Sequence, residues 1–265
     1  MHGAALAALA REDPRFAGWR YSAFDVEPGM LSRALELLGE RGFVGVNLTV
    51  PHKVLAVPLV SGLDAAAREA GAVNTLLREG SGWRGFNTDG YGLATGIRED
   101  LGIELKGTPV VLLGAGGAAR GAAVECLGSG CGGLWVHNRT AAALDSLLAQ
   151  VAPVARGIPA VALRGKGDVP GGALLINATS AGLRAGDPAP VDLRDFPGIR
   201  AVYDMIYNPP RTPLLAQARE LGLPCANGLG MLVHQGAKAL EIWTGVPAAR
   251  TAPAMREAAA KALGS

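Results

Sequence analysis

Apolar and polar residues alternate over a short stretch of the chain, V-N-L-T-V at residues 46–50. Alternation with a period of two predicts a strand that buries one face and leaves the other polar. A proline, a histidine and Lys53 follow at once, at the start of a predicted helix. A solvated sheet face would explain Asn47 and Thr49 but not the lysine, so the rest of the chain has to supply the reason.

Periodicity divides the chain into two α/β halves. In the first, strands are predicted at Trp19–Val26, Phe43–Val50, Ala72–Arg78 and Trp83–Phe86, and helices at 28–40, 51–59 and 64–70, after an N-terminal helix that ends before Asp13. A helix at about 89–101 follows the first half. In the second half, strands are predicted near 110–113, 133–137, 159–163, 173–177 and 200–204, with a helix at 213–221, and two helices at about 229–244 and 252–263 form the C-terminus. Strands that alternate with glycine turns and helices predict a mostly parallel, doubly wound sheet in the second half.

The composition excludes several classes of protein. Of the 265 residues, 49% are apolar and 18% charged, which is typical of a globular chain. The 25 basic and 23 acidic residues leave a net charge of +2 without a basic run, which argues against a nucleic-acid partner. No apolar run approaches the roughly 18 residues that span a bilayer. Three cysteines without paired spacing suit a reducing cytoplasm and predict no metal site.

A glycine-rich turn follows the strand V-V-L-L in the second half. Residues 114–119 read G-A-G-G-A-A, the pattern G-x-G-x-x-A at the start of a helix. The first glycine permits a tight turn, the second lets a pyrophosphate approach the backbone, and the helix N-terminus receives its charge. A βαβ unit closes at L-W-V-H, residues 134–137, so we predict a dinucleotide site.

The end of that second strand indicates which dinucleotide binds. An NAD site places an acid there for the ribose 2′-hydroxyl, whereas a cation suits the 2′-phosphate of NADP. Here the chain reads Asn138-Arg139-Thr140, and a guanidinium can hold the phosphate by two hydrogen bonds. The sequence therefore predicts NADP as the cofactor. A second polar turn, N-A-T-S-A-G at residues 177–182, ends another parallel strand and on its own is only suggestive.

The first half carries three groups suited to proton transfer or substrate binding. Lys53, Asn74 and Asp89 each lie at the edge of an apolar segment, in V-P-H-K, A-V-N-T-L-L and G-F-N-T-D-G. A dehydrogenase that acts on an alcohol needs a group to accept the hydroxyl proton as hydride leaves carbon. Most single lysines are solvated surface charges, but three such groups at element ends favour a site.

The residues together resemble the shikimate dehydrogenase family. The matching motifs run in order along the chain from His2 to the last helices: N-L-T-V-P-H-K, G-A-V-N-T, G-F-N-T-D-G, G-A-G-G-A-A, N-R-T, N-A-T-S-A-G, Y-D-M-I-Y and G-x-x-M-L-V-x-Q. N-x-T-x-P-x-K and G-F-N-T-D are uncommon outside this family. The resemblance implies interconversion of 3-dehydroshikimate and shikimate with NADP.

The resemblance also implies a role for individual residues. Lys53 and Asp89 would exchange a proton with the 3-hydroxyl of the substrate as a coupled pair. The substrate would be held by Thr49, Asn74, Asp89, Tyr207 and Gln235. The cofactor would be held by Gly114, Ala115, Gly116, Gly117, Ala118, Asn138, Arg139, Thr140, Thr179, Met205 and Gly228.

One part of the family pattern is absent. Members have a strand, a glycine turn and S-x-S-P shortly before the segment that here is Met1-His2, and the two serines bind the substrate carboxylate. Neither Ser22 nor Ser32 lies in such a motif. Loss of an interior strand would leave unpaired backbone groups on its neighbours. We therefore expect a misassigned start or a trimmed chain, or else weak substrate binding.

The resulting expectation is a two-domain α/β enzyme with a cleft between its domains. Residues 1–88 and 229–265 would form the substrate domain, 89–102 a linking helix and 103–228 a Rossmann-like NADP domain. We expect a cytoplasmic monomer or homodimer. Two alternatives remain open, namely an enzyme of broader specificity that accepts quinate, and a catalytically impaired NADP-binding homologue.

Overall fold

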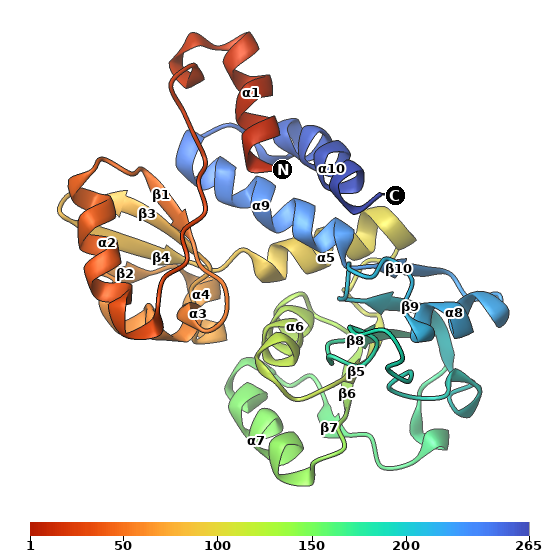
Figure 1. The fold of residues 1–265 in the computed structure, drawn as a ribbon. Helices are drawn as coiled ribbons and strands as arrows, with labels where there is room; N and C mark the ends of the chain where they lie inside the picture. The colour runs from red at the N-terminus through yellow and green to blue at the C-terminus, as the bar shows by residue number, and fades with distance from the viewer. Residues whose placement is uncertain (265) are drawn as a thin grey trace. The chain divides into compact units, whose positions relative to one another are not determined.

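The computed structural model describes residues 1–264, which form two compact units (Figure 1). The first unit comprises Met1–Asp89 and Val233–Ala259, and the second comprises Gly90–Leu232 and the chain from Ala260 onward. Each unit contains one sheet with flanking helices, so the predicted α/β class applies to both halves.

The first unit is built on a four-stranded sheet in the order β1-β3-β4-β2. Its strands are β1 Gly45–Asn47, β2 Gly62–Leu63, β3 Thr75–Glu79 and β4 Gly82–Phe86. Its helices are α1 His2–Glu12, α2 Leu31–Glu40, α3 His52–Leu55 and α4 Ala65–Ala70. Single 3₁₀ turns lie at Pro14–Phe16, Pro28–Met30 and Val57–Leu59. The β1–β3 and β3–β4 pairs are antiparallel, whereas β2 and β4 are parallel. Trp83 of β4 is buried and donates its indole N–H to the carbonyl of Leu35 at 3.1 Å, which fixes α2 on the sheet.

The strand predicted at Trp19–Val26 is wrong. This segment runs extended but belongs to no sheet, and Tyr21 and Phe24 are 42% and 57% exposed. The segment packs near β1 through side chains: the rings of Phe24 and Phe43 contact each other edge to face, with centroids 5.8 Å apart. Among the described residues β1 is an edge strand, and its one partner there is β3. An alternating segment becomes a strand only where a neighbour completes its hydrogen bonds, and among the described residues none does so.

The second unit is a doubly wound domain, as predicted. Its six strands are all parallel to their neighbours, in the order β10-β9-β8-β5-β6-β7. The strands are β5 Pro109–Leu113, β6 Gly133–His137, β7 Ala160–Ala162, β8 Ala173–Asn177, β9 Ile199–Asp204 and β10 Cys225–Asn227. The helices are α5 Asp89–Leu101, α6 Gly117–Gly128, α7 Ala141–Val151 and α8 Pro213–Glu220, with 3₁₀ turns at Ala152–Val154, Lys166–Asp168 and Leu193–Asp195.

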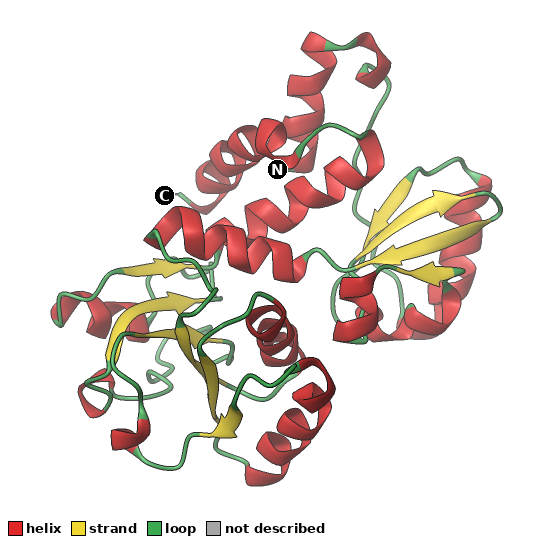
Figure 2. Cartoon of the chain, turned by 180° about the vertical axis from the view of Figure 1, so that it is seen from behind, coloured by secondary structure: helices red, strands yellow, loops and turns green. Residues whose placement is uncertain are grey.

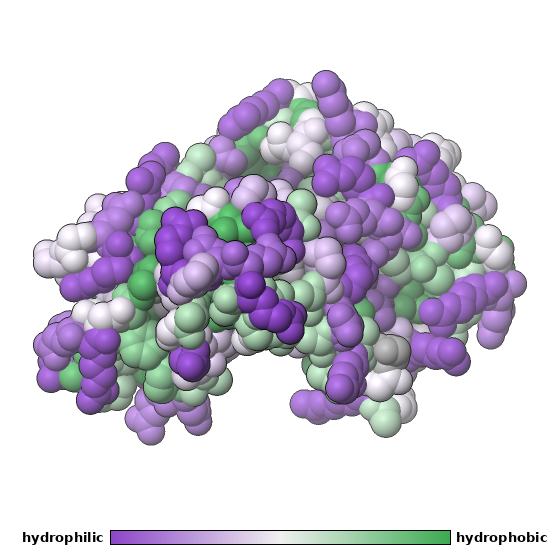
Figure 3. All heavy atoms as spheres, turned by 90° about the horizontal axis from the view of Figure 1, so that it is seen from above, coloured by the Kyte–Doolittle hydropathy of each residue, from purple (hydrophilic) through white to green (hydrophobic). Residues whose placement is uncertain are grey.

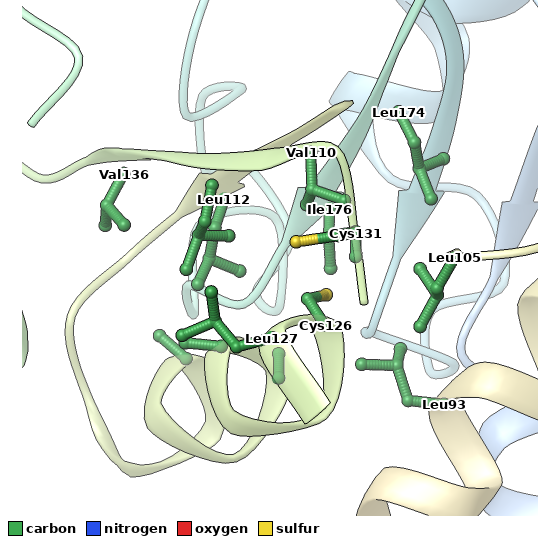
Figure 4. Packing of buried hydrophobic residues seen from close by; sticks show 14 of the residues in the cluster. Leu93, Leu105, Val110, Leu112, Cys126, Leu127, Cys131, Val136, Leu174 and Ile176 are labelled. Atoms are coloured by element: carbon green, nitrogen blue, oxygen red, sulfur yellow. The ribbon is translucent and has the colours of Figure 1, made fainter. Parts of the chain in front are cut away.

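Both faces of this parallel sheet are buried by helices (Figure 2). Val110 and Leu112 of β5 point into a cluster with α6, which Figure 4 shows from close by, with Cys126 and Cys131 among its members. The alternate residues Val111 and Leu113 point into a second cluster on the other face, together with residues of α8. Because both faces are covered, the central strands read as continuous apolar runs.

Two C-terminal helices follow, α9 Leu229–Thr244 and α10 Ala248–Leu263. Within the first unit α9 is attached to the sheet by Trp243, whose indole N–H donates to the carbonyl of Leu76 at 2.9 Å. The predicted start of α10 at residue 252 is too late, since the helix begins at Ala248 and continues through Pro253. Proline is common in the first turn of a helix and rare further inside one, but here the helix continues through Pro253. The short strand β10 was not predicted.

The surface mixes polar and apolar side chains. Figure 3 shows hydrophilic residues distributed over the visible face among smaller hydrophobic areas. Among the described residues, no helix combines the length and the apolar character needed to cross a membrane.

Candidate active site

The ammonium group of Lys53 is held by the carboxylate of Asp89. Lys53 belongs to the single turn α3, directly after β1, and its Nζ donates to Asp89 Oδ2 at 2.7 Å. Both side chains are about three-quarters buried, with 27% and 23% of their surface exposed. Partial burial strengthens the ion pair and still leaves it open to a ligand.

Two further predicted residues converge on this pair. Asn74 is 2% exposed and lies just before β3, where its amide nitrogen donates to Asp89 Oδ1 at 2.8 Å. The same nitrogen lies 3.5 Å from Oε1 of Gln235 on α9. Lys53, Asn74, Asp89 and Gln235 therefore form one polar cluster inside the first unit, from segments up to 161 residues apart.

Backbone and side-chain hydrogen bonds explain why these segments meet. The carbonyl of Lys53 accepts from the N–H of Val73 at 2.8 Å, which ties α3 to the segment that leads into β3. Asn87 donates to the carbonyl of Ala72 at 2.9 Å and accepts from the N–H of Asp89 at 3.0 Å. The turn that starts α5 is thus fixed against the same segment, so Asp89 faces Lys53.

Two predicted substrate residues lie outside this cluster. Thr49 precedes α3 and is exposed, and within the described part of the chain its backbone carbonyl alone is hydrogen-bonded, by the N–H of His52 at 2.8 Å. Tyr207 belongs to the second unit, where it follows β9 and is 39% exposed. No hydrogen bond of its hydroxyl to another described residue occurs. The roles predicted for both residues remain predictions.

The glycine turn after β5 has the geometry that a dinucleotide site requires. Gly114 adopts φ +110°, a conformation that side chains disfavour, and a Cβ there would lie 3.1 Å from the carbonyl oxygen of Ala178. β8, which ends at Asn177, is the neighbour of β5 in the sheet, while β6 lies on the other side. The connections that leave β5 and β8 therefore diverge at this point, which is where doubly wound sheets bind ligands.

The first turn of α6 is free to receive an anion. Gly116 is its N-cap and provides no side-chain hydrogen bond, and Gly117 and Ala118 are exposed. Their backbone N–H groups have no partner within the helix, as at every helix N-terminus. An approaching pyrophosphate would therefore meet free donors and the positive end of the helix dipole, with the half-buried Ala115 beside it.

The turn after β6 presents an arginine. Asn138 donates to the carbonyl of Thr140 at 3.0 Å, which shapes the turn, and Thr140 is the N-cap of α7. Arg139 is exposed, and its guanidinium makes no hydrogen bond or ion pair with the described residues. An unpaired guanidinium at this strand end fits the 2′-phosphate of NADP.

A buried polar network supports the opposite side of the glycine turn. Thr179 donates to Oδ1 of Asn177 at 2.7 Å, and Asn177 donates to Asp204 Oδ1 at 2.9 Å. Asp204 Oδ2 accepts from the hydroxyl of Thr212 at 2.6 Å. Burial raises the pKa of Asp204, while its three donors act in the opposite direction. The network connects the ends of β8, β9 and α8.

Met205 and Gly228 meet at the end of β9. The N–H of Met205 donates to the carbonyl of Asn177 at 3.0 Å, and a Cβ on Gly228 would lie 2.1 Å from the carbonyl oxygen of Met205. Only glycine fits at residue 228. Among the described residues, no group of three or more His, Cys, Asp or Glu side chains is arranged to hold a metal ion.

Comparison with known proteins agrees with this geometry. The sequence model of the shikimate dehydrogenase substrate binding domain matches residues 10–76, and that of the shikimate 5'-dehydrogenase C-terminal domain matches residues 228–260. The NADP(+)-dependent shikimate dehydrogenase of Citrifermentans bemidjiense is 40% identical over 250 residues, which cover 92% of this chain and 84% of the relative. The chain belongs to the shikimate dehydrogenase family. It is therefore an oxidoreductase, and the predicted family and enzyme class are confirmed.

Solved structures of the family have the same fold. Shikimate dehydrogenase from Thermus thermophilus, in complex with NADP(H) and shikimate, is 35% identical with a TM-score of 0.79 and covers 97% of this chain and 94% of its own. A 5-ketofructose reductase of a Gluconobacter species is 34% identical with a TM-score of 0.80, over 97% of this chain and 93% of its own. The predicted fold class is confirmed.

Several residues that support the sites of this family member were not predicted from the sequence. Asn47, Thr75 and Thr88 contact or surround Asn74, and each lies inside a quoted motif, but none was given a role. Asp204 and Thr212 were likewise missed as supports of Asn177. The signal that could have found them was the presence of polar residues inside otherwise apolar segments. Periodicity alone would assign such residues to a solvated face.

Proposed function

We propose that this chain catalyses the reversible, NADP-dependent interconversion of 3-dehydroshikimate and shikimate. The observation that carries the proposal is the Lys53–Asp89 pair with Asn74 on its carboxylate, in the unit whose sequence matches the family's substrate binding domain. Residues 1–88 and 229–265 would supply the substrate domain, 89–102 the linking helix and 103–228 the NADP domain. The enzyme would act in the cytoplasm, as a monomer or homodimer.

The second unit fits NADP. At Gly114 the positive φ and the Ala178 oxygen, 3.1 Å from where a Cβ would lie, disfavour a side chain. The N-cap of α6 is Gly116, which provides no side-chain hydrogen bond, and the guanidinium of Arg139 has no partner among the described residues. In this proposal residues 114–118 hold the pyrophosphate, residues 138–140 hold the 2′-phosphate, and Thr179, Met205 and Gly228 border the nicotinamide. NADP supplies the acceptor or donor of hydride, so the chain itself has only to handle a proton.

Lys53 would handle that proton. In the reducing direction its ammonium donates a proton to the oxygen that becomes the 3-hydroxyl, and in the oxidising direction the neutral amine accepts that proton. Asp89 stabilises the ammonium and keeps it directed, so that both residues take part in the proton exchange. Asn74 and Gln235, with Thr49 and Tyr207, would hydrogen-bond the remaining hydroxyls and the carboxylate.

A spectrophotometric assay tests the proposal. The chain is mixed with shikimate and NADP, and absorbance of reduced cofactor is followed near neutral pH, with NAD and with quinate in parallel reactions. We expect turnover of shikimate with NADP, and weaker turnover with NAD. A preparation that binds NADP but oxidises neither substrate would overturn the proposal and leave the impaired homologue.

A second candidate is a reductase for another polyol or keto sugar. The support for this candidate is the similarity to the 5-ketofructose reductase, which is 34% identical over nearly the whole of both chains. Quinate and 5-ketofructose therefore belong in the same assay. Faster turnover of either one than of shikimate would make that compound the substrate.

A further inference from the structure

A line of side-chain hydrogen bonds leads to the Lys53–Asp89 pair through the sheet of the first unit. Asn47 of β1 donates from Nδ2 to Oγ1 of Thr75 at 3.1 Å. Thr75 of β3 donates in turn to Oδ1 of Asn74 at 3.0 Å, and Asn74 donates to Asp89 Oδ1 at 2.8 Å. The line ends on the carboxylate that holds Lys53.

The direction of these hydrogen bonds is determined by the groups themselves. The backbone N–H of Thr88 donates to Oδ1 of Asn74 at 2.9 Å, so this atom is the carbonyl oxygen and the amide nitrogen faces Asp89. A hydroxyl has one proton, and that of Thr75 is used on Asn74, so its oxygen is free to accept from Asn47. Each residue therefore donates toward Asp89.

Water has no access to the middle of the line. Thr75 is 0% exposed and Asn74 is 2% exposed. Removal of the Thr75 hydroxyl would leave the side-chain carbonyl of Asn74 with one donor fewer, in a place where solvent cannot replace the bond. The amide of Asn47 would keep only its second acceptor, the backbone carbonyl of Asn74 at 3.2 Å. At the outer end, by contrast, Tyr21 donates to Asn47 at 3.1 Å and is 42% exposed, so water can take its place.

We propose that Asn47 and Thr75 are positioning residues, which hold the amide of Asn74 so that it fixes Asp89 opposite Lys53. The catalytic consequence rests on the function proposed above, whereas the positioning of Asp89 does not. Asn47 and Thr75 also face each other as a cross-strand pair of β1 and β3. A purely structural role in that pairing would lower stability without changing how the folded enzyme treats its substrate.

Three variants separate positioning from stability. Thr75→Val removes the hydroxyl at nearly constant volume, and Thr75→Ser keeps it. Thr251→Val is the matched control, because Thr251 is also buried in the first unit but donates only to the carbonyl of Ala248 in its own helix. For each variant, kcat and KM for shikimate are measured per folded molecule, together with the melting temperature.

We expect kcat to fall about tenfold in Thr75→Val, the effect of one buried hydrogen bond left unmade, with the KM for NADP unchanged. Thr75→Ser should restore most of the loss, and Thr251→Val should have the kcat of the wild type. A Thr75→Val enzyme that melts earlier but retains the wild-type kcat and KM would overturn the proposal.

A second measurement does not require turnover. Acetic anhydride acylates free amines faster than ammonium groups held by a carboxylate, and mass spectrometry reports the rate at each lysine. We expect Lys53 to be acylated severalfold faster in Thr75→Val than in the wild type or in Thr251→Val. Equal rates at Lys53 in all three proteins would contradict the positioning role, whatever substrate the enzyme uses.

Discussion

Lys53 Nζ lies 2.7 Å from Asp89 Oδ2, although 36 residues separate the two in the chain. The lysine comes from a single helical turn after β1, and the aspartate is the first residue of α5. Asn74 holds the second carboxylate oxygen. The pair is partly exposed, with 27% and 23% of the two side chains open to solvent, so a ligand could still reach it.

Loss of the lysine should abolish catalysis and spare the cofactor site. In Lys53→Ala we expect kcat to fall by about three orders of magnitude or more, since no other described amine meets Asp89. The Kd for NADP, measured by fluorescence titration, should change by less than about twofold, because residues 114–118 are untouched. Arg33→Ala, which breaks the exposed pair with Glu36, is the control and should be fully active. An equal loss of NADP affinity in Lys53→Ala would count against the assigned role.

Selectivity for NADP over NAD should depend on Arg139. Its guanidinium has no partner among the described residues, so we expect Arg139→Ala to raise the KM for NADP about 10- to 100-fold and to leave the KM for NAD nearly unchanged. Steady-state kinetics with both cofactors measure the ratio. Arg219→Ala removes an exposed arginine in the last turn of α8, in the same unit, and should alter neither value. A similar loss with both cofactors would assign Arg139 a structural role instead.

The glycine turn should not tolerate a side chain. Gly114→Ala places a Cβ at φ +110° and 3.1 Å from the Ala178 oxygen, so we expect a loss of about 1–3 kcal/mol in the free energy of unfolding and weaker NADP binding. Urea denaturation and NADP titration measure the two effects. Gly121→Ala adds the same methyl group within α6, where nothing lies within 4 Å, and should be neutral or slightly stabilising. Equal behaviour of the two variants would contradict the proposed strain.

The stability of the first unit should fall in mild acid through His2. Burial lowers the pKa of His2 from 6.5 to about 4, and its ring stacks on Tyr21 with centroids 4.2 Å apart. Between those pH values His2 is protonated in the unfolded chain but neutral in the folded one. The free energy of unfolding is therefore at its full value above pH 6.5 and decreases as the pH falls toward 4. The full loss is about 3 kcal/mol.

The variant His2→Phe isolates this contribution. It keeps an aromatic ring against Tyr21 and removes the titrating group. We expect urea denaturation at about pH 7 and about pH 4.5 to show a smaller difference in this variant than in the wild type. An unchanged difference would mean that other groups cause the acid sensitivity.

Most of the structure of the second unit could be predicted from local sequence. Its central strands are apolar runs, and the G-A-G-G-A-A turn after β5 needs only its own backbone and the adjacent helix to build a phosphate site. The parallel sheet, both buried faces and the main helices could be predicted for that reason. The β10 strand was missed because Cys225–Asn227 is too short to show a period and becomes a strand only beside β9.

The first unit shows where sequence falls short. Trp19–Val26 has the composition of a strand, yet it has no sheet partner, because pairing depends on which neighbour the fold places beside a segment. The motif letters located Lys53, Asn74 and Asp89, but not the hydrogen bonds that join them. The roles of Asn47 and Thr75 arise only when β1 and β3 lie in register and bring their side chains together. Residue types and local periodicity thus decide which groups are available, and tertiary contacts decide which of them meet, since a hydrogen bond requires two atoms within about 3 Å of each other.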